Sequence, residues 1–207
     1  MKVKKFINRA EFSCNVYVCS TEKCNFIVDL GYFDAEIDNY LKTLPAVDFV
    51  LQTHGHFDHI MGLNAFHKRY EQVPVYFYES EIDVCQMADF NGSFMTGCSY
   101  AVDFPVESLA EGQKIIKGQH FQVIHTPGHT EGSCMFSFPE DKVLFTGDTI
   151  IENSIGRTDL PTGNEEAIFR SLRKFSRLVF DPDTMVYFGH GDDYDYHTLK
   201  KQNPFIR

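Results

Sequence analysis

The sequence lacks three features that would each point to a particular class of protein. It has no run of the roughly 18–20 apolar residues that a membrane-spanning helix needs. Its first residues lack the apolar core of a signal peptide, and no Gly-, Ser- or Pro-rich linker divides the chain. We therefore expect one domain, residues 1–207, located in the cytoplasm and without a membrane partner.

Basic blocks and closely paired cysteines are missing as well. The formal net charge is −10, so the chain should repel phosphate backbones, and nucleic acid is not an expected partner. The six cysteines form no C-x-x-C pair. Because no export signal accompanies them, we expect reduced, buried thiols rather than disulfides.

The composition is typical of a globular protein with a substantial core, since 43% of the 207 residues are hydrophobic. Apolar runs bounded by turn residues predict strands at 12–19, 25–30, 47–52, 75–78, 115–116, 121–125, 134–138, 143–146 and 185–188. Helical spacing predicts helices at 34–44, 59–70, 79–87 and 165–175. This mixture predicts layered helices and sheets.

Histidines and aspartates gather where four of the predicted strands end. The segment T-H-G-H-F-D-H follows one strand, and T-P-G-H-T, F-T-G-D-T and F-G-H-G follow three others. Together they supply His54, His56, Asp58, His59, His129, Asp148 and His190. Imidazole and carboxylate groups suit zinc, iron or manganese, and seven ligands are too many for one tetrahedral ion. The pattern therefore predicts two metal ions that share a carboxylate.

The remaining histidines have no clustered polar partner in the sequence. We interpret them as ordinary surface or core residues: His67, His120, His125 and His197. The first histidine cluster alone could also be a polar surface loop, and the later strand-end loops are what favour a metal site.

T-H-G-H-F-D-H matches the H-x-H-x-D-H signature of the metallo-β-lactamase fold, and the three later segments resemble its other ligand motifs in order and spacing. Residues 27–31, 154–159 and 203–205 are similar to segments of short glyoxalase II-like hydrolases. The resemblance implies an α+β fold, a four-layer αββα sandwich. It also implies a chain that lacks the C-terminal helical domain of a full-length glyoxalase II.

The same resemblance implies a role for each ligand. His54, His56 and His129 would hold one ion; Asp58, His59 and His190 would hold the other. Asp148 would bridge the two ions, and Asp29 would orient a ligand from outside the coordination sphere. Zinc is the expected metal, with iron or manganese as alternatives. An aspartate at position 148, where well-known zinc β-lactamases carry cysteine, resembles the glyoxalase II, lactonase and persulfide dioxygenase branches.

The implied reaction is hydrolysis of a small thioester or ester, of the S-lactoylglutathione type, by metal-activated hydroxide. Asp58 would be catalytic, and Arg157 and Tyr194 would contact a substrate such as a glutathione thioester. Asp159 replaces a family tyrosine, which weakens the expectation for thiol recognition. The resemblance leaves three alternatives open: a mononuclear-iron persulfide dioxygenase, a lactonase, and a metal-binding module without chemistry.

Overall fold

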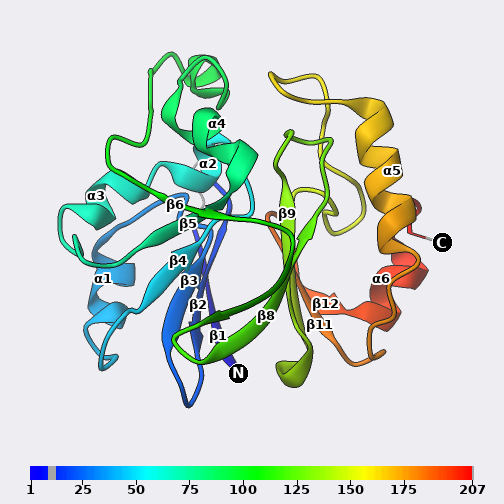
Figure 1. Cartoon of the computed structure of the whole chain (residues 1–207), viewed down its shortest axis with the longest axis horizontal. Helices are drawn as coiled ribbons and strands as arrows, with labels where there is room; N and C mark the ends of the chain where they lie inside the picture. Colours follow the sequence, from blue (N-terminus) through cyan, green and yellow to red (C-terminus); the bar gives the residue numbers. More distant parts are fainter. Residues whose placement is uncertain (9–12, 207) are drawn as a thin grey trace.

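The computed structural model describes residues 1–8 and 13–206, and it contains two β-sheets that face each other, with helices on their outer sides (Figure 1). The first sheet has the order β1-β2-β3-β4-β5-β6. Its strands are β1 (Lys2–Ile7), β2 (Asn15–Ser20), β3 (Asn25–Val28), β4 (Phe49–Leu51), β5 (Val75–Tyr78) and β6 (Glu107–Leu109). The first three strands are antiparallel, and β3 to β6 run parallel.

The second sheet has the order β12-β11-β10-β9-β8-β7. Its strands are β7 (Gly112–Ile116), β8 (Gln119–His125), β9 (Cys134–Phe138), β10 (Val143–Gly147), β11 (Met185–Phe188) and β12 (Tyr194–Asp195). Only β10 and β11 form a parallel pair among its hydrogen-bonded neighbours. Because β8, β10 and β11 run in one direction, their carboxyl ends meet at the same edge.

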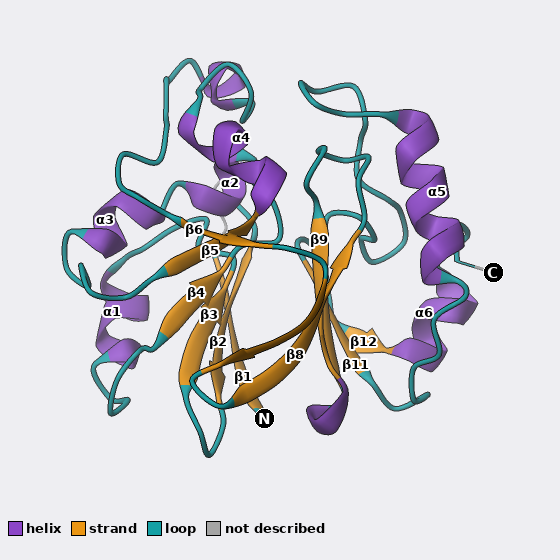
Figure 2. Cartoon of the chain, in the orientation of Figure 1, coloured by secondary structure: helices purple, strands orange, loops and turns teal. Residues whose placement is uncertain are grey.

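Helices cover the outer face of each sheet, as Figure 2 shows. The first sheet carries α1 (Ala35–Leu41), α2 (Phe57–Ile60), α3 (Leu63–His67) and α4 (Ile82–Gln86), and the second carries α5 (Glu165–Phe175) and α6 (Tyr196–Gln202). Short 3₁₀ turns occupy Glu79–Glu81, Ser93–Thr96 and Pro139–Asp141.

Side chains alternate between the two faces of each buried strand, and the apolar ones gather in three separate clusters. Each cluster lies between two neighbouring layers, so the molecule has four layers. In β2, Val16 and Val18 pack toward the helices of the first sheet, whereas Tyr17 and Cys19 pack between the two sheets. The third cluster joins the second sheet to α5 and α6. Successive strand residues point to opposite faces, so each sheet can bury both of its faces. The expected αββα sandwich is confirmed.

Backbone hydrogen bonds also join the two sheets at the edge where the polar loops lie. Asn15 N donates to Gly189 O at 2.7 Å, and Cys134 N donates to Thr53 O at 2.9 Å. These bonds connect a strand of one sheet to a polar loop that follows a strand of the other. The sandwich therefore holds its ligand-bearing loops from both sides.

The structure differs from the expected elements in several places. The helix expected at 59–70 is broken into α2 and α3, because the chain packs tightly at Gly62, where a Cβ atom would lie 2.5 Å from the carbonyl carbon of Tyr32. The first expected strand begins later, at Asn15, and position 12 lies outside the described residues. Sequence patterns missed β1, β6, β12 and α6.

Two sequence expectations concern cysteines and membranes. All six cysteines are free, and all except Cys98 are buried, which confirms the expectation of reduced, buried thiols for five of them. Within the described part of the chain, every helix is too short or too polar to cross a lipid bilayer.

Candidate metal centre

Three imidazoles converge at the shared edge of the two sheets. His129 Nε2 lies 3.2 Å from His54 Nε2 and 2.8 Å from His56 Nδ1. We call these three residues the inner triad. All three are buried, with exposed fractions of 1–3%. Ring nitrogens that approach this closely can be satisfied together by one cation.

A second group lies beside the inner triad and consists of Asp58, His59 and His190, which we call the outer triad. His190 Nε2 lies 3.1 Å from Asp58 Oδ2 and 3.3 Å from His59 Nε2. The outer triad is more open, since the side chains of His190 and Asp58 are 33% and 17% exposed. These groups are close enough to bind one ion.

Asp148 stands between the triads. Its Oδ1 lies 3.3 Å from His59 Nε2, and its Oδ2 lies 3.3 Å from His190 Nε2 and 3.7 Å from His129 Nε2. One carboxylate therefore faces imidazoles of both triads, as a bridging ligand must. The structure brings together all seven of the expected ligands.

Buried hydrogen bonds fix the ring orientations. Asp29 Oδ2 lies 3.0 Å from His59 Nδ1 and also accepts from the Thr53 hydroxyl at 2.8 Å, and that hydroxyl lies 3.1 Å from His54 Nδ1. The carbonyl oxygen of Arg157 lies 2.7 Å from His129 Nδ1. Such outer partners set which nitrogen faces the metal. Asp29 thus contacts His59 from outside the seven expected ligands, and its role in orienting a ligand stays a prediction.

The two triads differ in charge. Burial lowers the pKa of each inner imidazole, well below its ordinary value for His54 and to about 3 for His56. Neutral imidazole is the form that binds a metal, so the inner triad carries no competing protons at neutral pH.

In the outer triad, Asp148 raises the pKa of His190 to about 10. Burial opposes the charged form of His59, but Cys14, Asp148 and two further carboxylates raise its pKa well above its ordinary value. Burial opposes ionisation of Asp58 too, but His59 and His190 lower its pKa. Without an ion, outer imidazoles therefore hold protons that a metal must displace.

Two local observations fit the presence of cations. Asp148 Oδ1 is buried and makes no hydrogen bond within the described residues. At Gly189, an added Cβ atom would lie 2.0 Å from this same oxygen and 2.8 Å from a ring carbon of His59. Glycine at position 189 thus lets the backbone pack closely against a buried carboxylate oxygen that faces His59 Nε2 at 3.3 Å without a hydrogen bond, and the donor set suits zinc, iron or manganese.

Glu81 is a functional candidate that the sequence analysis missed. Its side chain is fully buried, and its two oxygens accept from Gly55 N at 2.5 Å and from Gly132 N at 2.7 Å. Gly55 lies between two inner ligands, and Gly132 lies in the loop of the third. Burial raises the pKa of Glu81 to about 7. One carboxylate therefore connects both loops of the inner triad.

The loop of His190 is held from the first sheet. The Tyr17 hydroxyl donates to Phe188 O at 2.6 Å, and Asn15 Nδ2 donates to Phe188 O and to Gly191 O, both at 3.0 Å. These contacts surround the ligand on its amino and carboxyl sides. Only the folded structure could identify them, because more than 170 residues separate the partners.

The triads open into a cleft of about 300 Å³. Arg157 lines this cleft, and its guanidinium makes two bonds of 2.7 Å to the Asp159 carboxylate. Tyr194 does not line it; the Tyr194 hydroxyl donates to the carbonyl oxygen of Glu152. The role of either residue in substrate binding stays a prediction.

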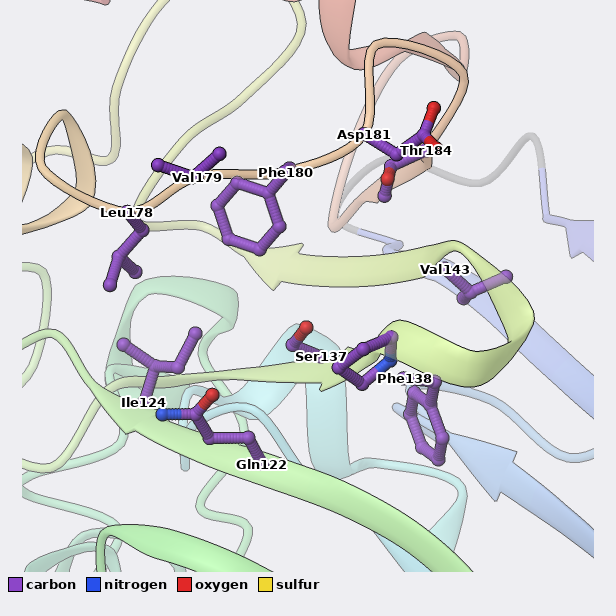
Figure 3. A pocket seen from close by; sticks show the side chains of 11 residues that line it. Gln122, Ile124, Ser137, Phe138, Val143, Leu178, Val179, Phe180, Asp181 and Thr184 are labelled. Carbon is purple, nitrogen blue, oxygen red and sulfur yellow. The ribbon is translucent and has the colours of Figure 1, made fainter.

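A different cavity, of about 150 Å³, lies between β8, β9 and the segment 178–184 (Figure 3). Figure 3 shows Leu178, Val179 and Phe180 opposite Ile124 and Gln122. None of the seven expected ligands lines this cavity. The chemistry therefore belongs to the cleft at the triads.

Sequence comparison adds a family and close relatives. The model of the Metallo-beta-lactamase superfamily matches residues 9–190. The "Probable metallo-hydrolase YqgX" of Bacillus subtilis (strain 168) is 32% identical over 193 residues, which is 92% of this chain and 90% of that protein. The "Hydroxyacylglutathione hydrolase GloC" of Haemophilus influenzae is 28% identical over 198 residues, covering 89% and 88%.

Solved structures share this architecture over nearly the whole chain. The BLEG-1 B3 metallo-beta-lactamase superposes with a TM-score of 0.89 at 32% identity, covering 99% of both chains. TTHA1623 in a di-iron-bound form has a TM-score of 0.84 at 29% identity, covering 97% of this chain and 98% of that one.

Proposed function

The chain belongs to the metallo-beta-lactamase superfamily, and we propose that it is a dinuclear metal-dependent hydrolase of a small thioester or ester. One observation carries this proposal: two triads share the Asp148 carboxylate at the floor of a cleft of about 300 Å³. A purely structural zinc site needs four ligands and no cleft, whereas this arrangement provides seven ligands and an opening.

The bound ions would supply the main catalytic chemistry, because two divalent ions lower the pKa of water from 15.7 toward ~7 and polarise a carbonyl oxygen. The protein's own residues hold and orient the reactants. Asp58 faces the cleft with Oδ2 next to His190 and could accept a hydrogen bond from the attacking water. In the net reaction, water oxygen bonds to the acyl carbon, the C–S or C–O bond breaks, and the thiol or alcohol leaves with a proton.

We propose a glyoxalase II-like activity at the finer level, with S-lactoylglutathione as the first thioester to test. Support comes from GloC, which is named as a hydroxyacylglutathione hydrolase. For the metal, the donor set supports zinc, with iron or manganese as alternatives. TTHA1623, a similar protein, has been described in a di-iron-bound form, which supports a pair of ions.

The test is metal quantification combined with a panel of thioesters, esters, lactones and persulfides on the same preparation. We expect two ions per chain and hydrolysis of at least one thioester or ester. Fewer than one ion per chain, without hydrolysis after loading with zinc, iron or manganese, would contradict the proposal. Oxygen uptake with glutathione persulfide and one iron per chain would instead identify a persulfide dioxygenase.

A further inference from the structure

The cleft wall outside the metal ligands is almost entirely apolar. Besides five of the expected ligands, the cleft is lined by Phe57, Met95, Ile151, Leu160 and Arg157. Phe57 and Leu160 both approach Gly92, at the start of the turn that carries Met95. The four apolar side chains that line the cleft with the triads are called the apolar wall: Phe57, Met95, Ile151 and Leu160. An apolar wall stabilises an apolar group, because both surfaces leave water on binding.

Apart from the expected ligands, Arg157 is the single cationic side chain among the described residues that line the cleft, and its charge already has a partner. Asp159 accepts two parallel bonds from its guanidinium, at 2.7 Å each. The Nε–Nη2 edge of the guanidinium is thus occupied, which leaves the Nη1 side for an incoming carboxylate. A substrate carboxylate must therefore displace Asp159 or bind near its negative charge.

From these two observations we propose that the cleft selects thioesters or esters whose group beside the scissile bond is apolar and uncharged. The inference rests on the proposed hydrolase activity and narrows its substrate class. Within the glyoxalase II-like activity proposed above, it ranks a thioester of an uncharged thiol above S-lactoylglutathione, whose thiol part carries carboxylates. Asp159 then determines specificity by keeping Arg157 occupied.

Two substrate series test the inference on metal-loaded protein. In the first, acetyl, butanoyl and hexanoyl groups are carried by one uncharged thiol, N-acetylcysteamine. We expect kcat/KM to rise about two- to fourfold for each added methylene that enters the cleft. In the second, a lactoyl group is carried by benzyl mercaptan or by glutathione, and we expect the uncharged thioester to be at least tenfold better.

Variants connect these results to the named residues. Met95→Ser should abolish the rise of kcat/KM along the acyl series. Met87→Ser, at an exposed position outside the cleft, should leave that rise unchanged. Asp159→Asn should free Arg157 and raise kcat/KM for S-lactoylglutathione several-fold relative to kcat/KM for the uncharged thioester. Both Met95 and Asp159 are exposed enough for substitution to leave the fold intact.

A binding measurement does not depend on turnover. Calorimetry on metal-loaded protein compares S-hexyl-N-acetylcysteamine with S-methylglutathione, neither of which can be hydrolysed. We expect heat of binding only from the hexyl compound. A flat acyl series, a preference for S-lactoylglutathione, or tighter binding of S-methylglutathione would overturn the inference. Selective binding of the hexyl compound without hydrolysis of any substrate would support the inference and contradict the proposed function alone.

Discussion

The inner and outer triads share Asp148 but differ in almost every other respect. The inner triad is buried, its imidazoles are neutral, and Glu81 joins its two loops. The outer triad is more exposed at His190 and Asp58, and its imidazoles hold protons until a metal displaces them. The difference teaches that the two halves of one candidate metal centre, although both reach the cleft, present an ion with different burial and different proton occupancy.

Removing the shared ligand should have the largest effect. Asp148→Ala leaves both triads incomplete, so we expect loss of both ions and a fall in kcat of about 1,000-fold or more, as for loss of ~4 kcal/mol of transition-state stabilisation. Metal analysis and steady-state kinetics measure this. Asp103→Ala, at an exposed aspartate, is the matched control. An Asp148→Ala protein that keeps two ions would show that this carboxylate does not bridge them.

A methyl group at Gly189 should affect the outer triad and spare the inner one, because of the groups with which it would collide. Its Cβ atom would lie 2.0 Å from Asp148 Oδ1 and 2.8 Å from the ring of His59, on the outer side of the centre. We expect Gly189→Ala to lose the outer ion and to lower kcat about 100-fold, while the inner ion stays. Retention of both ions with normal kcat would mean that the outer site tolerates the extra atom.

Acidification should distinguish the triads through their protons. The pKa of His190 is raised to about 10 and that of His59 is raised as well, so below pH 8 an outer ion must displace protons. The affinity of the outer triad for its ion should therefore fall about tenfold for each unit by which the pH is lowered, for each proton displaced. The pKa of His56 is lowered to about 3, so inner affinity should change little between pH 6 and 8.

Stepwise metal titrations at pH 6, 7 and 8, repeated in buffers of different ionisation enthalpy, count these protons directly. Proton release should accompany the weaker binding step. Release that accompanies the tighter step instead would reverse the assignment of neutral imidazoles to the inner triad.

The smallest expected effect comes from Glu81→Gln. The amide NH₂ group cannot accept a hydrogen bond, so one of the two backbone N–H groups would lose its acceptor. This loss costs about 1–3 kcal/mol and weakens the connection between the two inner loops. We expect about tenfold weaker inner binding, unchanged outer binding, and no effect of Glu79→Gln, an exposed control. Equal thermal destabilisation of apo and metal-loaded protein, with unchanged affinities, would reduce Glu81 to a structural residue.

Local patterns predicted the parts of the molecule that depend on neighbouring residues. T-H-G-H-F-D-H places four candidate ligands within six positions. Short apolar runs predicted β5, β9 and β11 with the bounds that the structure has. The strand-end position of each polar segment was enough to predict one shared site. The sequence alone therefore named the seven candidate ligands that the structure brings together.

Features that depend on distant contacts could not be predicted in this way. Glu81 stands in a segment expected to be helical, and its role exists only because folding brings Gly55 and Gly132 together. The break before α3 arises from close packing of Gly62 on Tyr32, which hydrophobic spacing cannot reveal. β1 was missed because the adjacent residues Lys4 and Lys5 interrupt the polar–apolar alternation that would have indicated this edge strand.

The number of ions held by each triad tests the central claim most directly. Metal analysis should find two ions per chain in the unmodified protein, and one tightly held ion in His190→Ala, because the inner triad stays complete. His129→Ala should lose the tightly held ion. A single ion in the unmodified protein, or loss of all metal from His190→Ala, would contradict the account of two triads that share one carboxylate.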